Sequence, residues 1–349
     1  MTIAVKTPAR LHLGILDTNG DLGRLYGSIG VAIERPNIVL EAEPADRLLV
    51  EGLEAERVAT FAHRFLDHYP LPHGARLCLK ASIPSHVGLG SGTQLALAVG
   101  MALARLGGME LGITEIAVTM GRGAQSGIGI ATFQRGGFVV DGGHRVAGKG
   151  GAAPAPAGIG VPPVLFHQPF PAGWYFVTIL PAAGKGFSGE KEQRAFETLP
   201  PAPPTLAEKI SRLLLMKLLP ALVERDVVPF GQALTEIQRL VGDSFAAVQG
   251  SRYANALSER LVDFLLNHGA AGAGQSSWGP TVYALVEGRS QALLLEREAR
   301  EFLAGHGGGQ TFCTRADNCG VRVRRIAPRS AKNGESHGKN RRLPIDKAL

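Results

Sequence analysis

Pro84-Ser-His-Val-Gly-Leu-Gly-Ser-Gly-Thr-Gln94 is the most informative segment of this chain of 349 residues. Alternating glycines stand directly before a run of strong helix formers, residues 95–104. The apolar alternation Leu77–Leu79 and apolar Ile83 precede the glycines. This order predicts a strand, a glycine-rich loop and then a helix. The first turn of such a helix presents unpaired backbone N–H groups and the positive end of the helix dipole. We therefore expect the loop to bind a phosphate or pyrophosphate group.

The loop differs from the two best-known phosphate-binding motifs. No Gly-Lys-Ser/Thr follows it, and its glycine spacing is wrong for a dinucleotide-binding fingerprint. Its backbone N–H groups and hydroxyls would cradle the phosphate, and Ser91 is a candidate magnesium contact. Gln94 either faces the substrate or only hydrogen-bonds the loop. The expected phosphate-binding residues are Gly88, Leu89, Gly90, Ser91, Gly92, Thr93 and Gln94.

Two further segments occur in a familiar order around the loop. Pro8-Ala-Arg-Leu-His-Leu-Gly14 precedes it and Gly272-Ala-Gly-Gln-Ser-Ser-Trp-Gly-Pro-Thr-Val-Tyr-Ala284 follows it. Together with the loop they resemble the motifs of the GHMP superfamily, named for galacto-, homoserine, mevalonate and phosphomevalonate kinases. The resemblance implies an α+β fold with the two lobes of a GHMP kinase.

One family of that superfamily is more similar than the kinases. Gly121-Arg-Gly-Ala-Gln-Ser-Gly-Ile-Gly129 and Gly136-Gly-Phe-Val-Val-Asp-Gly142, with the segments above, look like β-ribofuranosylaminobenzene 5′-phosphate synthases over residues 3–325. The resemblance implies transfer of ribosyl 5-phosphate from phosphoribosyl pyrophosphate to 4-aminobenzoate or a close para-substituted benzoate. Pyrophosphate and CO₂ would be released, in an early step of tetrahydromethanopterin biosynthesis. It further implies a Mg²⁺ cofactor and a homodimer.

The main alternative is a small-molecule kinase that uses ATP. Many GHMP kinases carry an aspartate that deprotonates the attacking hydroxyl, and Gly129 stands at the matching position here. Without a nearby base an alcohol is a poor nucleophile at neutral pH, so this glycine favours the synthase. A non-catalytic ligand-binding relative is the third reading.

Several polar side chains are candidates for the substrate pocket. Arg10 and His12 lie two residues apart on the first predicted strand and therefore point to one face. Arg122 and Gln125 stand in the second glycine-rich segment, where an arginine suits anion binding. We expect these four residues to be catalytic. Asp17 either closes the same pocket or caps the turn that follows it.

The C-terminal glycine motif supplies further candidates. Trp278 either stacks on the benzoate ring or is a buried structural residue. Asp141 either ligates magnesium, with Ser91, or begins a turn with the next two glycines. The resemblance also extends to Lys185 and Glu190, for which a solvated loop is the default. The expected substrate-binding residues here are Gln275, Ser276, Ser277 and Trp278.

The charge of the chain, +7, resides at its C-terminal end. Residues 322–349 hold nine lysines and arginines and two acidic residues, so the rest of the chain is neutral. We expect a basic, disordered tail after residue 326 and no nucleic-acid partner. No apolar run is long enough for a membrane span. Three cysteines without metal-ligand spacing are typical of a reducing, cytoplasmic compartment.

The composition also suggests how the chain is divided. A Gly/Ala/Pro-rich segment over residues 148–163 separates an N-terminal lobe, 1–160, from a C-terminal lobe, 161–326, with the tail at 327–349. Helical periodicity predicts five longer helices outside the glycine loop: 55–69, 206–225, 230–249, 252–268 and 290–305.

Overall fold

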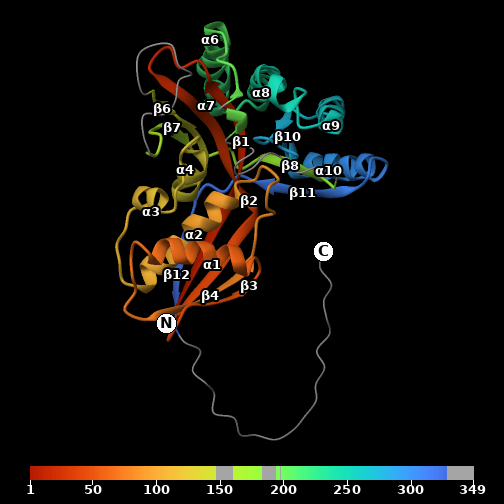
Figure 1. The fold of residues 1–349 in the computed structure, drawn as a ribbon. Helices are drawn as coiled ribbons and strands as arrows, with labels where there is room; N and C mark the ends of the chain where they lie inside the picture. The colour runs from red at the N-terminus through yellow and green to blue at the C-terminus, as the bar shows by residue number, and fades with distance from the viewer. Residues whose placement is uncertain (147–159, 183–193, 197, 328–349) are drawn as a thin grey trace, which may run out of the picture.

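A computed structural model of the protein describes residues 1–146, 160–182, 194–196 and 198–327. Its elements form two antiparallel-rich sheets with helices packed on them (Figure 1). The α+β class expected from the sequence is confirmed.

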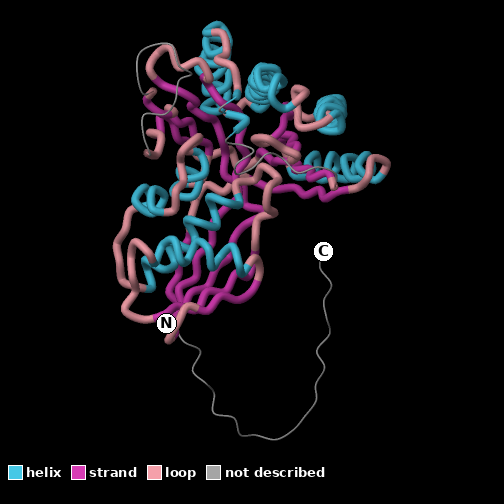
Figure 2. The backbone as a smooth tube through the Cα atoms, in the orientation of Figure 1, coloured by secondary structure: helices cyan, strands magenta, loops and turns pink. Residues whose placement is uncertain are grey.

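The larger sheet is built around a long antiparallel pair, β1 (Thr2–Asp17) and β2 (Arg24–Ala45). These two strands run nearly the whole height of the molecule (Figure 2). Buried positions alternate with more exposed ones toward one end of the pair, whereas consecutive residues are buried in the middle of both strands, so both faces are covered there. The other strands of this sheet are β3 (Leu49–Gly52), β4 (Gly74–Ala81), β5 (Phe138–Asp141), β6 (His144–Arg145), β7 (Val164–Gln168) and β12 (Arg322–Ile326).

Helices α1 (Ala55–Leu66) and α2 (Ser91–Leu106) cover one face of this sheet. α2 is rich in alanine and almost wholly buried, so it packs closely on the strands. At Gly100 a Cβ would lie 2.6 Å from a side-chain carbon of Ile116 in α3 (Ile113–Thr119), so only glycine permits that approach. A short helix, α4 (Ile128–Arg135), follows in the glycine-rich segment and was not predicted.

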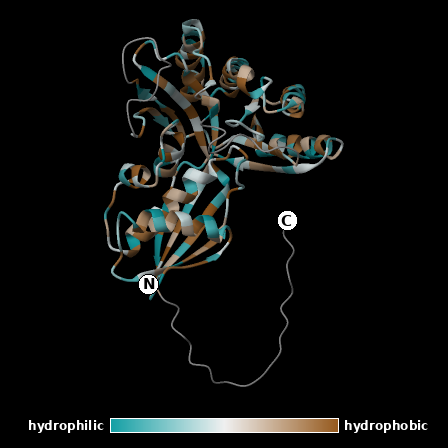
Figure 3. Cartoon of the chain, in the orientation of Figure 1, coloured by the Kyte–Doolittle hydropathy of each residue, from teal (hydrophilic) through white to brown (hydrophobic). Residues whose placement is uncertain are grey.

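The smaller sheet has the order β11 (Gly309–Arg315), β8 (Trp174–Pro181), β10 (Val282–Glu287) and β9 (Gly272–Gln275). Hydrophilic and hydrophobic segments alternate along its helix α10 (Arg289–Ala304) in Figure 3, because one face packs on the sheet. The other helices of this half are α6 (Pro204–Leu213), the π-helix η1 (Leu214–Leu218), α7 (Leu219–Glu224), α8 (Val227–Gln249) and α9 (Ala256–Asn267).

Strand pairing departs from a division of the chain at residue 160. β7 pairs with β5, and β12 returns to pair with β1. These two strands, which the prediction assigned to the second lobe, therefore belong to the first sheet. The first lobe is therefore discontinuous in sequence, because β12 follows all the strands of the smaller sheet. Most of the Gly/Ala/Pro-rich segment lies outside the described residues, as do Lys185, Glu190 and nearly all of the basic tail. Every helix in the described part of the chain is too short or too polar to cross a lipid bilayer.

Candidate active site

The glycine loop holds the left-handed backbone that its sequence predicts. Gly88 has φ +84° and Gly90 has φ +80°, a region that favours glycine, and α2 begins at Ser91. The first-turn N–H groups of α2 lack partners within the helix, as at any helix start. The loop therefore offers the backbone donors that an anion needs.

Two other parts of the chain fix this loop in place. The carbonyl oxygen of Gly88 accepts hydrogen bonds from the guanidinium of Arg10 on β1 and from the hydroxyl of Ser276 after β9, the second at 2.7 Å. The Ser276 Oγ also accepts from the backbone N–H of His12 at 3.0 Å. In return the Ser277 N–H donates to the His12 carbonyl at 3.2 Å. All three sequence motifs that carried the resemblance thus meet at one point.

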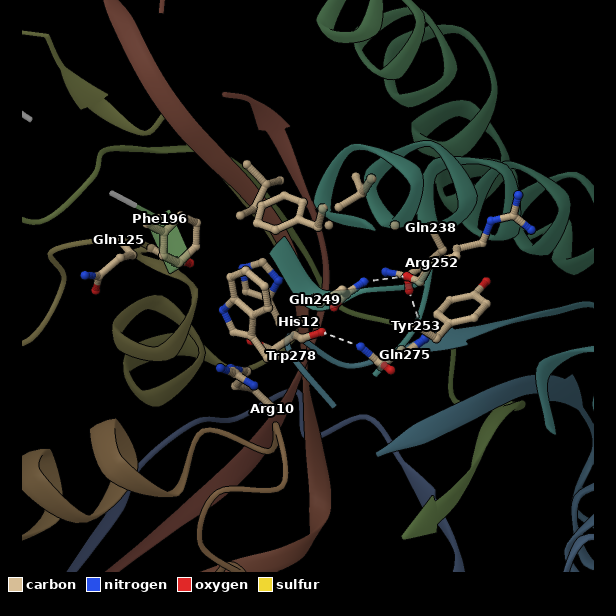
Figure 4. A pocket seen from close by; sticks show the side chains of 17 residues that line it. Arg10, His12, Gln125, Phe196, Gln238, Gln249, Arg252, Tyr253, Gln275 and Trp278 are labelled. Carbon is tan, nitrogen blue, oxygen red and sulfur yellow. Dashed lines mark hydrogen bonds between the residues drawn. The ribbon is translucent and has the colours of Figure 1, made fainter. Parts of the chain in front are cut away.

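A cavity lies beside this junction, with about 690 Å³ of atom-free space that is partly open solvent. In Figure 4 Arg10 and His12 of β1 and Trp278 meet near its centre, with Gln238 and Gln249 of α8 beside them. The structure brings six of the predicted site residues to this cavity: Arg10, His12, Gln125, Gln275, Ser277 and Trp278. None of the described residues that line it is an aspartate or glutamate.

His12 is buried beside a positive charge. Burial, with a smaller effect of Arg10, lowers the pKa of His12 to about 3. The imidazole is therefore neutral at physiological pH and too weakly basic to be an efficient general base. It remains able to donate or accept one hydrogen bond at each ring nitrogen.

Aromatic rings form one wall of the cavity. Trp278 packs edge-to-face on Phe245 of α8, with 4.9 Å between ring centroids, and on Phe196 at 5.4 Å. Only 7% of Trp278 is exposed. The two alternatives for this residue are therefore compatible, because the same ring belongs to a buried cluster and lines the cavity.

Gln275 lines the cavity but its amide is engaged by the backbone. The side-chain oxygen accepts from the N–H of Ala254 at 2.7 Å, and the amide nitrogen donates to the Ser277 carbonyl at 3.1 Å. Gln238 supports it, because its oxygen accepts from the Gln275 N–H at 2.8 Å and its nitrogen donates to the Leu13 carbonyl at 2.6 Å. Both glutamines hold the cavity wall together.

The guanidinium group of Arg122 lies near the first turn of α2, and Arg122 does not line the cavity. A Cβ on Gly92 would lie 3.6 Å from one guanidinium nitrogen of Arg122 and 3.3 Å from one of Arg57. Burial, followed by the charges of Arg57 and Arg64, lowers the pKa of Arg122 to about 10, so the group is still a cation at neutral pH. The position agrees with an anion-binding role, at the phosphate loop.

Gln94 and Asp17 were expected to contact a ligand, but their side chains bind other parts of the protein. Gln94 is fully buried and points away from the loop: its oxygen accepts from the Thr7 hydroxyl and its nitrogen donates to the Gly129 carbonyl at 2.8 Å. Asp17 accepts from the N–H groups of Asn19 at 2.6 Å and Gly20 at 3.2 Å. It caps the turn and does not line the cavity.

Asp141 is also a structural residue, which corrects its expected role as a magnesium ligand. It is fully buried, and its two oxygens accept from the N–H groups of Gly127 and Gly143, each at 2.9 Å. Burial raises its pKa to about 6. Nor does the described part of the chain contain a cluster of three or more His, Cys, Asp or Glu that would hold a metal ion. Near the loop the described residues offer the Ser91 hydroxyl and the Glu54 carboxylate, which Arg57 already pairs, so they do not fit a magnesium site built from protein ligands alone.

Sequence reasoning missed several residues at this site. Arg57 is on the polar face of an ordinary amphipathic helix, and Gln238 and Phe245 lie on another. Phe61, whose ring lies under two guanidinium groups, looks like a core residue. Nothing local marks them; only the fold brings them to the loop and the cavity.

Both halves of the chain match families of known proteins. Residues 56–137 match the GHMP kinases N terminal domain and residues 218–305 the GHMP kinases C terminal family. A mevalonate kinase from L. major, solved with R-mevalonate, superposes with a TM-score of 0.64 at 14% identity, covering 90% of this chain and 96% of that one. At this low identity the likeness shows the fold alone.

Two relatives are much more similar in sequence. The beta-ribofuranosylphenol 5'-phosphate synthase of Archaeoglobus fulgidus is 37% identical over 327 residues, which are 92% of this chain and 99% of the relative. The protein of the same name from Methanothermobacter thermautotrophicus is 36% identical over 296 residues, 82% of this chain and 89% of the relative. The chain therefore belongs to the beta-ribofuranosylphenol 5'-phosphate synthase family of enzymes, within the GHMP superfamily.

Proposed function

We propose that the protein transfers ribosyl 5-phosphate from phosphoribosyl pyrophosphate to a para-substituted benzoate, releasing pyrophosphate and CO₂. The observation that carries the proposal is the junction at Arg10. This side chain bonds the anion-binding loop and also lines a cavity with aromatic walls, whose described lining residues include no acidic side chain. A charged pyrophosphate and a flat aromatic acid would thus bind side by side.

The reaction needs no base to activate the acceptor. The C1–O bond of the ribose breaks, and its electron pair leaves with the pyrophosphate. The ring carbon that bears the carboxylate is para to an electron-donating group, and it attacks C1. The C–CO₂ bond then breaks, its electron pair restores aromaticity, and CO₂ departs. The protein has to orient both reactants and stabilise charge, which suits a cavity with no carboxylate among its described lining residues.

The kinase alternative loses support at two places. Gly129 lies beside the loop, where a Cβ would meet the side chain of Thr93 at 3.0 Å, and it supplies no carboxylate. His12, the histidine among the described residues that line the cavity, is a poor base because of its lowered pKa. Among the described residues, an alcohol bound here would find no efficient proton acceptor.

The relatives' name specifies a phenol product, which corresponds to 4-hydroxybenzoate as acceptor; 4-aminobenzoate would give the aminobenzene analogue. Both acceptors satisfy the electronic requirement, because hydroxyl and amino groups donate electrons to the para carbon. We include the role in tetrahydromethanopterin biosynthesis and the homodimer in this proposal. Magnesium would accompany the pyrophosphate, held by its oxygens and by water.

The test is release of labelled CO₂ from the carboxyl group of each acceptor, with phosphoribosyl pyrophosphate and Mg²⁺. We expect CO₂ and pyrophosphate in equal amounts, with neither product when one substrate is omitted. Parallel reactions contain ATP and a panel of small alcohols. Turnover of ATP without CO₂ release would refute the synthase and establish the kinase. Saturable binding without turnover in either assay would indicate a ligand-binding protein.

A further inference from the structure

We infer that Arg57 and Arg122 form a clamp for the departing pyrophosphate at the start of α2 and neutralise its charge where a kinase would use a protein-held metal ion. The identity of the anion rests on the proposed function. The existence of a diphosphate site does not, because it follows from the arrangement of the two side chains.

The two guanidinium groups approach the same point from different elements. Arg57 belongs to α1, and Arg122 follows α3. The nearest atoms to a Cβ built on Gly92 would be Nη2 of Arg57 at 3.3 Å and Nη1 of Arg122 at 3.6 Å. Nη2 of Arg57 also lies 3.5 Å from the Ser91 hydroxyl. A phosphate group above the first turn of α2 would therefore lie within reach of both cations.

Neighbouring side chains hold the pair in this position. Both guanidinium groups lie over the ring of Phe61, at 6.0 Å for Arg57 and 5.0 Å for Arg122. Glu54 accepts from Arg57 at 2.7 Å and is itself bonded by the hydroxyls of Ser82 and Ser85. Preorganised donors of this kind lose little entropy when the anion binds.

The positive charge at this point exceeds what the protein compensates. Glu54 balances Arg57, but within the described residues Arg122 makes no ion pair, and its Nε is buried without a hydrogen-bond partner. A partly buried cation whose donor is shielded from water and unused is costly unless a ligand supplies the counter-charge. A diphosphate supplies charge and acceptor oxygens together. Paired arginines suit it because each guanidinium donates two parallel hydrogen bonds to phosphate oxygens.

The experiment measures binding of inorganic pyrophosphate to the full chain by calorimetry, without Mg²⁺ and without the other substrates. We expect Arg57→Gln and Arg122→Gln each to weaken binding about tenfold and the double variant about a hundredfold, the usual loss for charge-assisted hydrogen bonds. Arg76→Gln is the matched control, because Arg76 is half-exposed and pairs with Glu43 and Glu51. It should leave affinity unchanged.

Two further variants keep the test decisive if a glutamine variant fails to fold. Gly92→Ala retains both arginines and favours the helix, but its methyl group would stand 3.3 Å from Nη2 of Arg57 and 3.6 Å from Nη1 of Arg122, where the anion would bind. It should weaken pyrophosphate binding while the protein stays folded. Arg122→Lys keeps the charge but not the paired donors, and should bind with intermediate affinity.

The two hypotheses fail separately. Unchanged pyrophosphate affinity in the folded double variant would overturn the clamp, whatever the enzyme turns over. With an active enzyme, the clamp predicts a higher KM for the sugar pyrophosphate and a lower kcat in the arginine variants, and an unchanged KM for the benzoate. A rise in the KM of the benzoate alone would also overturn it. Absence of CO₂ release with arginine-dependent pyrophosphate binding would refute the synthase and leave the diphosphate site standing.

Discussion

Replacing Gly88 by alanine tests how tightly the phosphate loop is bound to the second half of the site. An alanine at this position meets two penalties. Its φ of +84° costs an L-residue about 1–2 kcal/mol. Its Cβ would also lie 2.2 Å from the backbone carbonyl oxygen of Ser276, which no side-chain rotation relieves.

The second penalty propagates into the hydrogen bonds of the junction. If the loop moves away from Ser276, its carbonyl oxygen loses good geometry with the Arg10 guanidinium and the Ser276 hydroxyl. A neutral hydrogen bond contributes about 0.5–1.5 kcal/mol and one to a charged group about 1.5–3 kcal/mol. Gly88→Ala should therefore reduce the free energy of unfolding by about 3–6 kcal/mol.

Gly108→Ala is the matched control for backbone strain. Gly108 has φ +69° and nothing within 4 Å of its would-be Cβ, just beyond the other end of α2. It should cost only the strain, about 1–2 kcal/mol. The assay is urea unfolding followed by circular dichroism, together with pyrophosphate affinity. Equal losses of stability in the two variants, with affinity retained in Gly88→Ala, would refute the coupling between the loop and Ser276.

Three shorter predictions concern the corrected and the ambiguous residues. Gln94→Leu should lower the free energy of unfolding in urea by about 1–3 kcal/mol, because it leaves buried polar partners unsatisfied, and should not alter pyrophosphate affinity; a weaker affinity at unchanged stability would return Gln94 to the ligand site. Burial raises the pKa of Asp141 from 3.8 to about 6, so the folded state binds this proton more tightly than the unfolded chain; the resulting stabilisation is complete below 3.8 and lost as the pH rises through 6. Asp141→Asn should flatten that part of the urea-midpoint profile, and an unchanged slope would contradict the assignment. Trp278→Leu should raise the KM of the benzoate more than that of the sugar pyrophosphate in steady-state assays, whereas equal rises would mean that the ring only supports the fold.

The sequence predicted best what is encoded locally. The left-handed glycines and the helix that begins at Ser91 follow from residues within a few positions of one another. The amphipathic helices follow from their periodicity, although the helix predicted at 206–225 contains the π-helical segment η1 between α6 and α7, and α4 was missed. Arg10, His12 and Trp278, which the sequence suggested for the substrate pocket, line one cavity in the structure, and their roles with substrate stay predictions.

Polar residues with distant partners were the hard cases. Gln94 stands one residue after a phosphate-loop hydroxyl, yet its side chain serves Thr7, 87 positions away, because the first turn of a helix presents side chains in every direction around its axis. The same reasoning explains why Arg122 could be predicted from the sequence and Arg57 could not. Arg122 could be singled out because a glycine-rich segment gives few other reasons for a charge, whereas Arg57 looks like any exposed residue of an amphipathic helix. The common function that we propose for them depends on Gly92, which lets a cation from α1 and a cation from the loop after α3 face the same helix start. A site of this kind is a property of three elements together, so removing the charge of either arginine should matter more than any change in the loop's side chains.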